Sequence, residues 1–180
     1  MLTPEEHSIV QRVHEGPIFQ AFIVFIERTK GDDAIPRFRD VDLISNYKLA
    51  RNIYILDVHQ GTPTFKVRYA GSEINKMLGF EPTGKFLEEL KFLEDLNEIK
   101  GGYQKIVRER IPYVFLNPIT FDEPKMSPFK KGQKFVMARL AFPLLDDDQR
   151  IGHIIGVMDF PPNDNFPLER FCALPYSVIP

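Results

Sequence analysis

The sequence has 180 residues, which is the length of one domain with a short extension and is enough to bury a sizeable core. Hydrophobic residues make up 43% of the chain and charged residues 27%, as in ordinary globular proteins. The formal net charge of −2 gives no field that would attract nucleic acid or an anionic membrane. We therefore predict neither nucleic-acid binding nor membrane insertion.

The cysteine content and the first residues bear on where the chain works. Its one cysteine, Cys172, cannot form an internal disulfide, so a reducing compartment is the simpler interpretation. The N-terminus lacks the basic segment followed by an apolar segment that marks a signal peptide. The longest apolar run, 21–26, is too short to span a bilayer. We predict a cytoplasmic protein.

An N-terminal helical extension is predicted for residues 1–35. Thr3, Pro4 and Glu6 form the pattern of a capping box with proline at the first helical position. A second helix is expected over 18–30, and its apolar character on every side requires burial against the sheet, another subunit or both. The side chains that we expect to form a dimer or partner surface are Ile18, Phe19, Phe22, Phe25 and Ile26.

Two adjacent segments predict a β-hairpin. Residues 52–58 and 64–70 are rich in β-branched and aromatic side chains and are separated by a turn sequence. In the second segment Phe65, Val67 and Tyr69 alternate with cationic residues, which indicates a sheet with one buried and one wetter face. Tyr69 is thus expected on the same face as Phe65.

Helical patterns follow the hairpin. We predict one or two helical turns within 71–80, a helix over 85–96, and an apolar helical stripe that continues towards Arg110. Pro112 ends this stripe.

The last third of the chain predicts three strands, over 113–121, 134–144 and 150–160, with an acidic turn between the last two. The strand over 134–144 has an unbroken apolar face and is therefore expected in the centre of the sheet. Residues 122–133 read as a polar loop, and residues 161–180 as a proline-containing tail.

The order of these segments resembles the PAS domain superfamily, and more closely a bacterial stand-alone PAS family. The matching pieces are "IPRFRDVD", "NIYILDV", "FKVRYAGSEI", "GFEPTGKFLEEL" and "LAFPLLDDDQRIGHIIGV". The resemblance implies an α+β fold over residues 36–160, with a PAS-like five-stranded antiparallel sheet of order 2-1-5-4-3 covered by helices.

The resemblance also implies a non-enzymatic sensory or regulatory role in signal transduction. Such domains act through a small-molecule pocket between the sheet and the helices, here residues 78–103. They also act through protein contacts, either in a homodimer or with a signalling-protein partner. A flavin photosensor of this type would carry a reactive cysteine, but residues 71–100 contain none. A haem sensor would carry an axial histidine, but residues 84–111 contain none. We predict no cofactor.

Aromatic, cationic and sulfur-containing side chains supply the candidates for ligand binding. The candidates are Arg68, Tyr69, Phe86, Tyr103, Phe115, Arg139, His153 and Met158. The Tyr hydroxyls would provide the few polar contacts that a pocket needs. Aromatic and Met side chains at these spacings more often belong to an ordinary packed core, which is the interpretation we favour for them as a group.

The three polar candidates each have a structural alternative. Arg68 can hold a carboxylate ligand or pair with Glu73 or a neighbouring strand. Arg139 interrupts an apolar strand, and we favour an edge residue whose charge reaches water over an anchor in a pocket. His153 is best explained as a hydrogen-bonded packing residue.

Metal binding and catalysis find little support in the sequence. The acidic run 146–148 lacks the ligand spacing of a calcium loop, so no metal site is predicted. An enzyme with Asp57 or Asp159 as a general base in an apolar pocket is the first alternative function. A structural interaction module without a ligand is the second.

Overall fold

The computed structural model describes residues 3–61, 64–90, 95–120, 132–162, 166 and 170–176. The helices are α1 (Pro4–Glu15), α2 (Pro17–Lys30), η1 (Phe38–Asp40), α3 (Tyr47–Ala50), α4 (Ser72–Leu78), η2 (Leu87–Glu89) and α5 (Leu96–Glu109). The strands are β1 (Ile53–His59), β2 (Thr64–Ala70), β3 (Tyr113–Thr120), β4 (Lys134–Leu145), β5 (Ile151–Asp159) and β6 (Cys172–Pro175).

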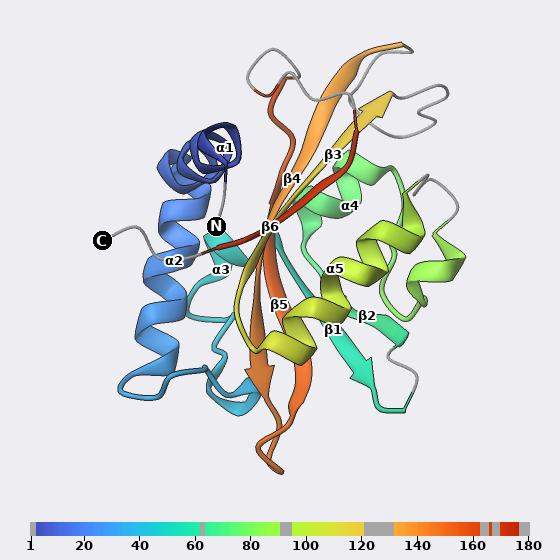
Figure 1. Ribbon diagram of the computed structural model, residues 1–180. Coiled ribbons are helices and arrows are strands. Elements are labelled where there is room, and N and C mark those ends of the chain that lie inside the picture. The colour runs from blue at the N-terminus through green and yellow to red at the C-terminus, as the bar shows by residue number, and fades with distance from the viewer. Residues whose placement is uncertain are drawn as a thin grey trace.

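The strands form a six-stranded antiparallel sheet in the order β2-β1-β5-β4-β3-β6 (Figure 1). This order confirms the predicted α+β, PAS-like fold and the predicted central position of β4. The prediction of five strands was wrong in one respect, because part of the tail over 161–180 adds β6 beside β3. Leu174 of β6 is buried, so this short strand is held by packing as well as by pairing.

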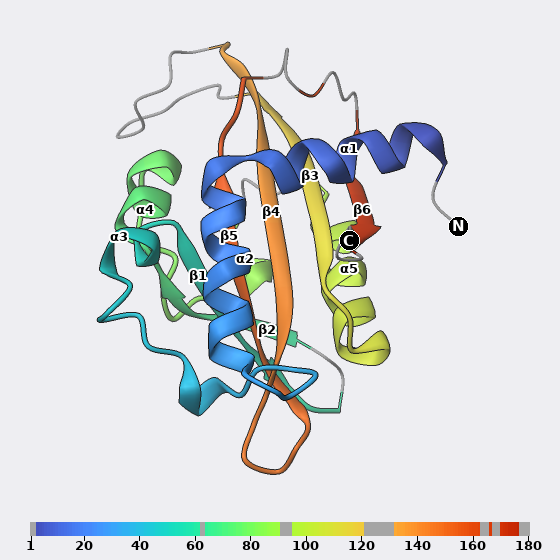
Figure 2. The same cartoon turned by 90° about the vertical axis from the view of Figure 1, so that its left-hand side faces the viewer.

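Helices cover both faces of the sheet. Figures 1 and 2 show α1 and α2 on one face, while α4 and α5 lie on the other. Each face has its own hydrophobic core, because side chains alternate along the strands. On β4, Ala138 and Leu140 belong to the core under α2, whereas Met137 and Ala141 belong to the core under α5.

The N-terminal helices begin as their sequences predict. The Thr3 hydroxyl accepts a hydrogen bond from the backbone of Glu6, and the Glu6 carboxylate accepts one from the backbone of Thr3 at 2.7 Å. This reciprocal pair is the predicted capping box. Proline occupies the first position of α1 and of α2, where no intrahelical donor is lost.

The apolar face of α2 is buried within the chain itself. Phe19, Phe22, Phe25 and Ile26 have exposed fractions of 5% or less and pack into the core between α2 and the sheet. Ile18 is half-buried. In the single chain, four of the five residues expected to form a partner surface are therefore core residues, because the sheet offers α2 an apolar face to cover.

A β-bulge overturns the predicted alternation of β2. Ile55 lies opposite Tyr69 and Leu56 lies opposite Val67, so Arg68 has no counterpart on β1. An extra residue of this kind moves all following side chains to the other face of the sheet. Tyr69 consequently packs towards the core under α2, away from Phe65 and Val67.

The segment after Gly79 differs from the predicted helix over 85–96. Among the described residues of that range, Leu87–Glu89 forms a single 3-10 turn and Leu96 begins α5, while residues 91–94 lie outside the described residues. The backbone of Val67 donates to Lys85 at 2.9 Å and accepts from Gly84 at 2.7 Å. These bonds along the edge of β2 hold the chain extended at the point where the prediction began a helix. The predicted loop over 122–133 also lies largely outside the described residues.

Candidate functional site

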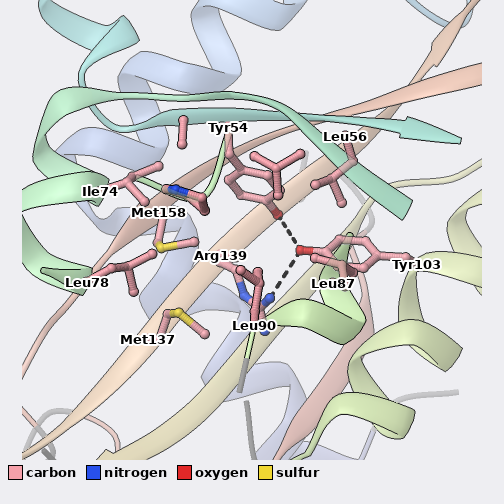
Figure 3. A pocket seen from close by; sticks show the side chains of 13 residues that line it. Tyr54, Leu56, Ile74, Leu78, Leu87, Leu90, Tyr103, Met137, Arg139 and Met158 are labelled. Carbon is pink, nitrogen blue, oxygen red and sulfur yellow. Dashed lines mark hydrogen bonds between the residues drawn. The ribbon is translucent and has the colours of Figure 1, made fainter. Parts of the chain in front are cut away.

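A cavity lies between the sheet and the helices α4, η2 and α5 (Figure 3). Its volume is about 50 Å³, counted as the space open to the centre of a water molecule. A space of this size holds a few water molecules or a ligand of a few heavy atoms. The cavity is lined by Tyr54, Leu56, Val67, Ala70, Ile74, Leu78, Pro82, Leu87, Leu90, Tyr103, Met137, Arg139 and Met158.

The periodicity of the strands and helices explains why these residues meet. Tyr54 and Leu56 are two apart on β1, and Met137 and Arg139 are two apart on β4, so each pair shares one face of the sheet. In α4, the apolar side chains of Ile74 and Leu78, four residues apart, form the opposite wall. The alternation thus gathers a mainly apolar lining with one cation and two phenols.

A glycine creates the space for the Tyr54 ring. Gly156 of β5 lies directly opposite Tyr54 of β1. A Cβ atom at this glycine would overlap the Tyr54 ring. The missing side chain lets the ring lie over β5, and its hydroxyl then reaches Tyr103.

The polar groups of the cavity form one hydrogen-bonded chain. The Arg139 Nη1 donates to the Tyr103 hydroxyl at 3.1 Å, and that hydroxyl donates to the Tyr54 hydroxyl at 3.0 Å (Figure 3). The Arg139 Nη2 donates to the side-chain oxygen of Asn117 on β3. Burial, reinforced by the neighbouring Tyr103 phenol, raises the pKa of Tyr54 well above its ordinary value, although Arg139 opposes this shift. The Tyr54 hydroxyl is therefore protonated at neutral pH.

Arg139 is buried in an unusual environment for a cation. Its exposed fraction is 3%, and β4 lies between β5 and β3 in the interior of the sheet. The guanidinium carbon lies 5.1 Å from the centroid of the Phe115 ring and 5.9 Å from that of Tyr103. Nε has no hydrogen-bond partner among the described residues. The favoured prediction, an edge residue with its charge in water, was wrong because β4 is not an edge strand.

A second glycine positions the aromatic ring behind Arg139. Gly102 of α5 is buried against Phe115, and a Cβ atom there would overlap the Phe115 ring. The close approach of helix and strand lets Phe115 contact Tyr103, with ring centroids 4.8 Å apart. The guanidinium is thus enclosed by rings that favour a cation over their faces.

The cavity includes three of the eight side chains predicted to bind a ligand, namely Tyr103, Arg139 and Met158. Phe115 packs behind Tyr103 and Arg139. Phe86 does not line the cavity. Its ring contacts the imidazole of His59 and lies 5.6 Å from the ammonium of Lys66.

Arg68 and His153 lie on the other face of the sheet and share the carboxylate of Asp57. The guanidinium of Arg68 pairs with Asp57, and His153 Nδ1 is hydrogen-bonded to the same carboxylate at 2.9 Å. The imidazole also stacks on Phe38, with ring centroids 3.9 Å apart. Burial lowers the pKa of His153, while Asp57 opposes that shift. Both residues therefore have the structural roles that were weighed against ligand binding.

Tyr69 also lies away from the cavity. Its hydroxyl donates to the backbone oxygen of Ala50 at 3.0 Å, and the bulge at Arg68 is the reason for this orientation. Burial raises the pKa of the Tyr69 hydroxyl.

Two polar participants, Tyr54 and Asn117, were not among the predicted site residues. Tyr54 lies in the predicted strand over 52–58, and the alternation of that strand places it on the same face as Leu56. Asn117 is buried with an exposed fraction of 4%, and an amide within an apolar strand is a signal for a buried polar partner. The contact of Asn117 with Arg139 joins residues on different strands, which periodicity alone cannot pair.

Neither carboxylate considered as a general base lines the cavity. Asp57 is paired on the other face of the sheet, and Asp159 at the end of β5 accepts a hydrogen bond from the backbone of Phe160 at 2.9 Å. Across the described ranges, no group of three or more His, Cys, Asp or Glu side chains is placed to hold a metal ion. None of the helices in those ranges combines the length and apolar character needed to cross a bilayer.

Comparisons with known proteins give matches among solved structures. No protein-family model matches the sequence, and no curated protein sequence matches it. A Light-Oxygen-Voltage domain studied with a flavin analogue matches with 17% identity and a TM-score of 0.48, covering 69% of this chain and 88% of that domain. The light-state structure of the blue-light photoreceptor Aureochrome1 LOV matches with 16% identity and a TM-score of 0.46, covering 68% and 91%.

A third match is VqmA bound to DPO, with 11% identity and a TM-score of 0.44, covering 65% of this chain and 57% of that one. Light-Oxygen-Voltage domains are themselves PAS-superfamily domains. These similarities concern the fold alone. The one cysteine of the present chain, Cys172, lies on β6 opposite Leu116 and is not part of the cavity.

Proposed function

We propose that this chain is a non-enzymatic PAS-type sensory module that binds a small molecule in the cavity beneath α4, η2 and α5. The observation that carries the proposal is a mainly apolar cavity in which the polar groups of Tyr54, Tyr103 and Arg139 meet. Such a combination is typical of small-molecule sites, where apolar walls supply contact and few polar groups fix orientation. Its location in the cytoplasm remains a prediction from the sequence.

The central strand provides a route from the cavity to the opposite face. On β4, Met137 and Arg139 line the cavity, while the intervening Ala138 packs in the core under α2. A ligand that moves β4 therefore also changes the surface on which α2 rests. The ligand must bind one arrangement of these elements more tightly than the other for this coupling to carry a signal.

The output of the module is contact with a second copy of the chain or with a signalling-protein partner. Burial of the inner side of α2 leaves its outer side for this contact, and Val24 there has an exposed fraction of 47%. This assignment replaces the earlier expectation that Phe22 and Phe25 reach the partner.

Native mass spectrometry of the protein purified from its source, compared with a denatured sample, tests ligand binding. We expect a small mass that is retained by the native protein and lost on denaturation. Ala70 lines the cavity, and the larger side chain of Ala70→Leu would occupy part of the space, so this variant should retain less of that mass. Ala21→Leu makes the same change at an exposed position of α2 and should retain as much as the wild type.

Two outcomes would contradict the proposal. One is the absence of any retained mass in the native wild-type protein. The other is equal retention by the wild type and Ala70→Leu, which would place the bound molecule elsewhere. The first outcome would favour the alternative of a structural interaction module without a ligand.

A further inference from the structure

We propose that the cavity selects a small monocarboxylate, with the carboxylate bound at Arg139 and the apolar part against the Met and Leu side chains. This inference rests on the proposed ligand-binding function and adds the chemical class of the ligand. A small-molecule site does not require a buried cation, so the charge of Arg139 needs an explanation of its own.

The charge of Arg139 is not neutralised within the described part of the chain. None of the carboxylates there lies within ion-pair distance of its guanidinium, and its hydrogen bonds go to the neutral side chains of Tyr103 and Asn117. A guanidinium stays protonated in proteins, so burial cannot remove its charge. Buried charges are paired in most proteins, because an isolated charge in an apolar environment is costly. An anion in the adjacent cavity would supply the missing partner.

Hydrogen-bond donors remain for such an anion. Nε of Arg139 is buried and has no acceptor in the described part of the chain. The Tyr103 hydroxyl accepts from Arg139 and donates to Tyr54, so the proton of the Tyr54 hydroxyl has no acceptor among the described residues. A phenol and a guanidinium on one wall are thus both donors (Figure 3). Donors without acceptors favour a ligand that carries acceptor oxygens. Among the hydrogen bonds that such a ligand can form, charge-assisted bonds to a carboxylate are the strongest.

The rest of the lining limits the size and charge of the ligand. Apart from Arg139 and the two phenols, the lining consists of apolar side chains. Among them are Leu56 on β1, Leu90 after η2 and Met158 on β5. The volume of about 50 Å³ favours a ligand of a few heavy atoms. One buried cation balances one negative charge, so a dianion would enter with a charge that nothing in the lining neutralises.

Isothermal titration calorimetry of the full chain at pH 7 and constant ionic strength tests this class. The probes are the linear acids from acetate to hexanoate, with butyramide and 1-butanol as neutral counterparts of butyrate. We expect at least one acid to bind, and butyrate to bind about tenfold or more tightly than butyramide, as loss of a charge-assisted hydrogen bond predicts.

Three variants locate the carboxylate. Arg139→Met should abolish the preference for butyrate over butyramide, because it removes the cation and keeps an unbranched side chain. Tyr54→Phe removes one hydroxyl and should weaken butyrate binding severalfold while leaving the preference for the acid. Arg68→Met is the matched control, since it removes an exposed arginine from the other face of the sheet and should change neither value.

The outcomes separate this inference from the proposed function. If butyramide or 1-butanol binds as tightly as butyrate, the cavity binds ligands but the carboxylate assignment is wrong. If no acid binds while the protein from its source retains a small mass in the cavity, the assignment is also wrong and ligand binding stands. If Arg139→Met does not fold, the comparison of acid with amide in the wild type and in Tyr54→Phe still decides.

Discussion

The contact between Arg139 and Asn117 shows how a buried polar group depends on its partner. Asn117 supplies the acceptor for Nη2, and both side chains are almost fully buried. Replacing Asn117 by Leu keeps the branched shape and the number of heavy atoms but leaves a donor of Arg139 without an acceptor. We expect Asn117→Leu to lower the free energy of unfolding by about 1–3 kcal/mol, the cost of an unsatisfied buried group.

The double variant Arg139→Met, Asn117→Leu removes both members of the contact. Because no unsatisfied group then remains in this pair, the loss of stability should be smaller than the sum of the two single losses. Urea denaturation of the four proteins at neutral pH measures both values. Strictly additive losses would show that the two side chains do not stabilise each other.

His153 provides a second test at the level of single residues. Burial lowers its pKa, Asp57 raises it and Arg68 lowers it. Removing Arg68 as Arg68→Met should therefore raise the pKa of His153, whereas Asp57→Asn should lower it further. Titration of the imidazole by NMR checks both directions, and a shift of the same sign in both variants would contradict this description of the cluster.

The lowered pKa of His153 also fixes the sign of its effect on stability. Because the unfolded state binds the proton more readily, the contribution of His153 is fully present above its ordinary pKa of 6.5 and is lost as the pH falls towards the folded value. Acidification through this range should thus reduce the free energy of unfolding.

At the scale of elements, two adjacent glycines of α5 are expected to respond in opposite ways. Gly101 has open space where a Cβ atom would lie, so Gly101→Ala should raise the free energy of unfolding by about 0.5–1 kcal/mol through helix propensity. Gly102 lies against the Phe115 ring, so Gly102→Ala should lower it by about 1–3 kcal/mol through overpacking. Thermal and urea denaturation compare the two, and equal effects would contradict the close packing of α5 on β3.

The elements themselves were largely predictable from the sequence, because periodicity and caps are local signals. The hairpin, the three later strands and the capping box of α1 are confirmed. The bulge at Arg68 was not predictable, since it is defined by the register between two strands and not by the pattern of one. The strand β6 was not predicted, because its four residues lie among prolines and polar residues and show no strand pattern of their own. Their pairing with β3 makes them a strand.

The candidate site was predictable only in part, for a related reason. Tyr103 and Met158 were placed correctly because they lie on apolar faces of confirmed elements. The role of Arg139 depends on whether β4 is an interior strand and on which rings surround the guanidinium, and both are tertiary facts. Its interpretation changed from an exposed edge residue to the buried cation of a cavity.

At the scale of the molecule, the sheet separates the face that carries the cavity from the face that α1 and α2 cover. If the outer side of α2 makes the contact with a second copy, Val24→Glu should shift the mass measured by size-exclusion chromatography with light scattering towards that of the monomer. Ile44→Glu is the matched control, because Ile44 is 89% exposed and is not part of α2. Equal masses for the wild type and Val24→Glu would exclude this face from a homodimer.

If a ligand in the cavity acts through the sheet, its binding should change the stability of α2 on the opposite face. Hydrogen–deuterium exchange followed by mass spectrometry tests it most directly, on the protein as purified from its source and on the same protein after denaturation, removal of small molecules and refolding. We predict that the refolded protein exchanges faster in α4, α5 and also in α2, and that the purified ligand fraction reverses the change. Identical exchange in the two samples would contradict the claim.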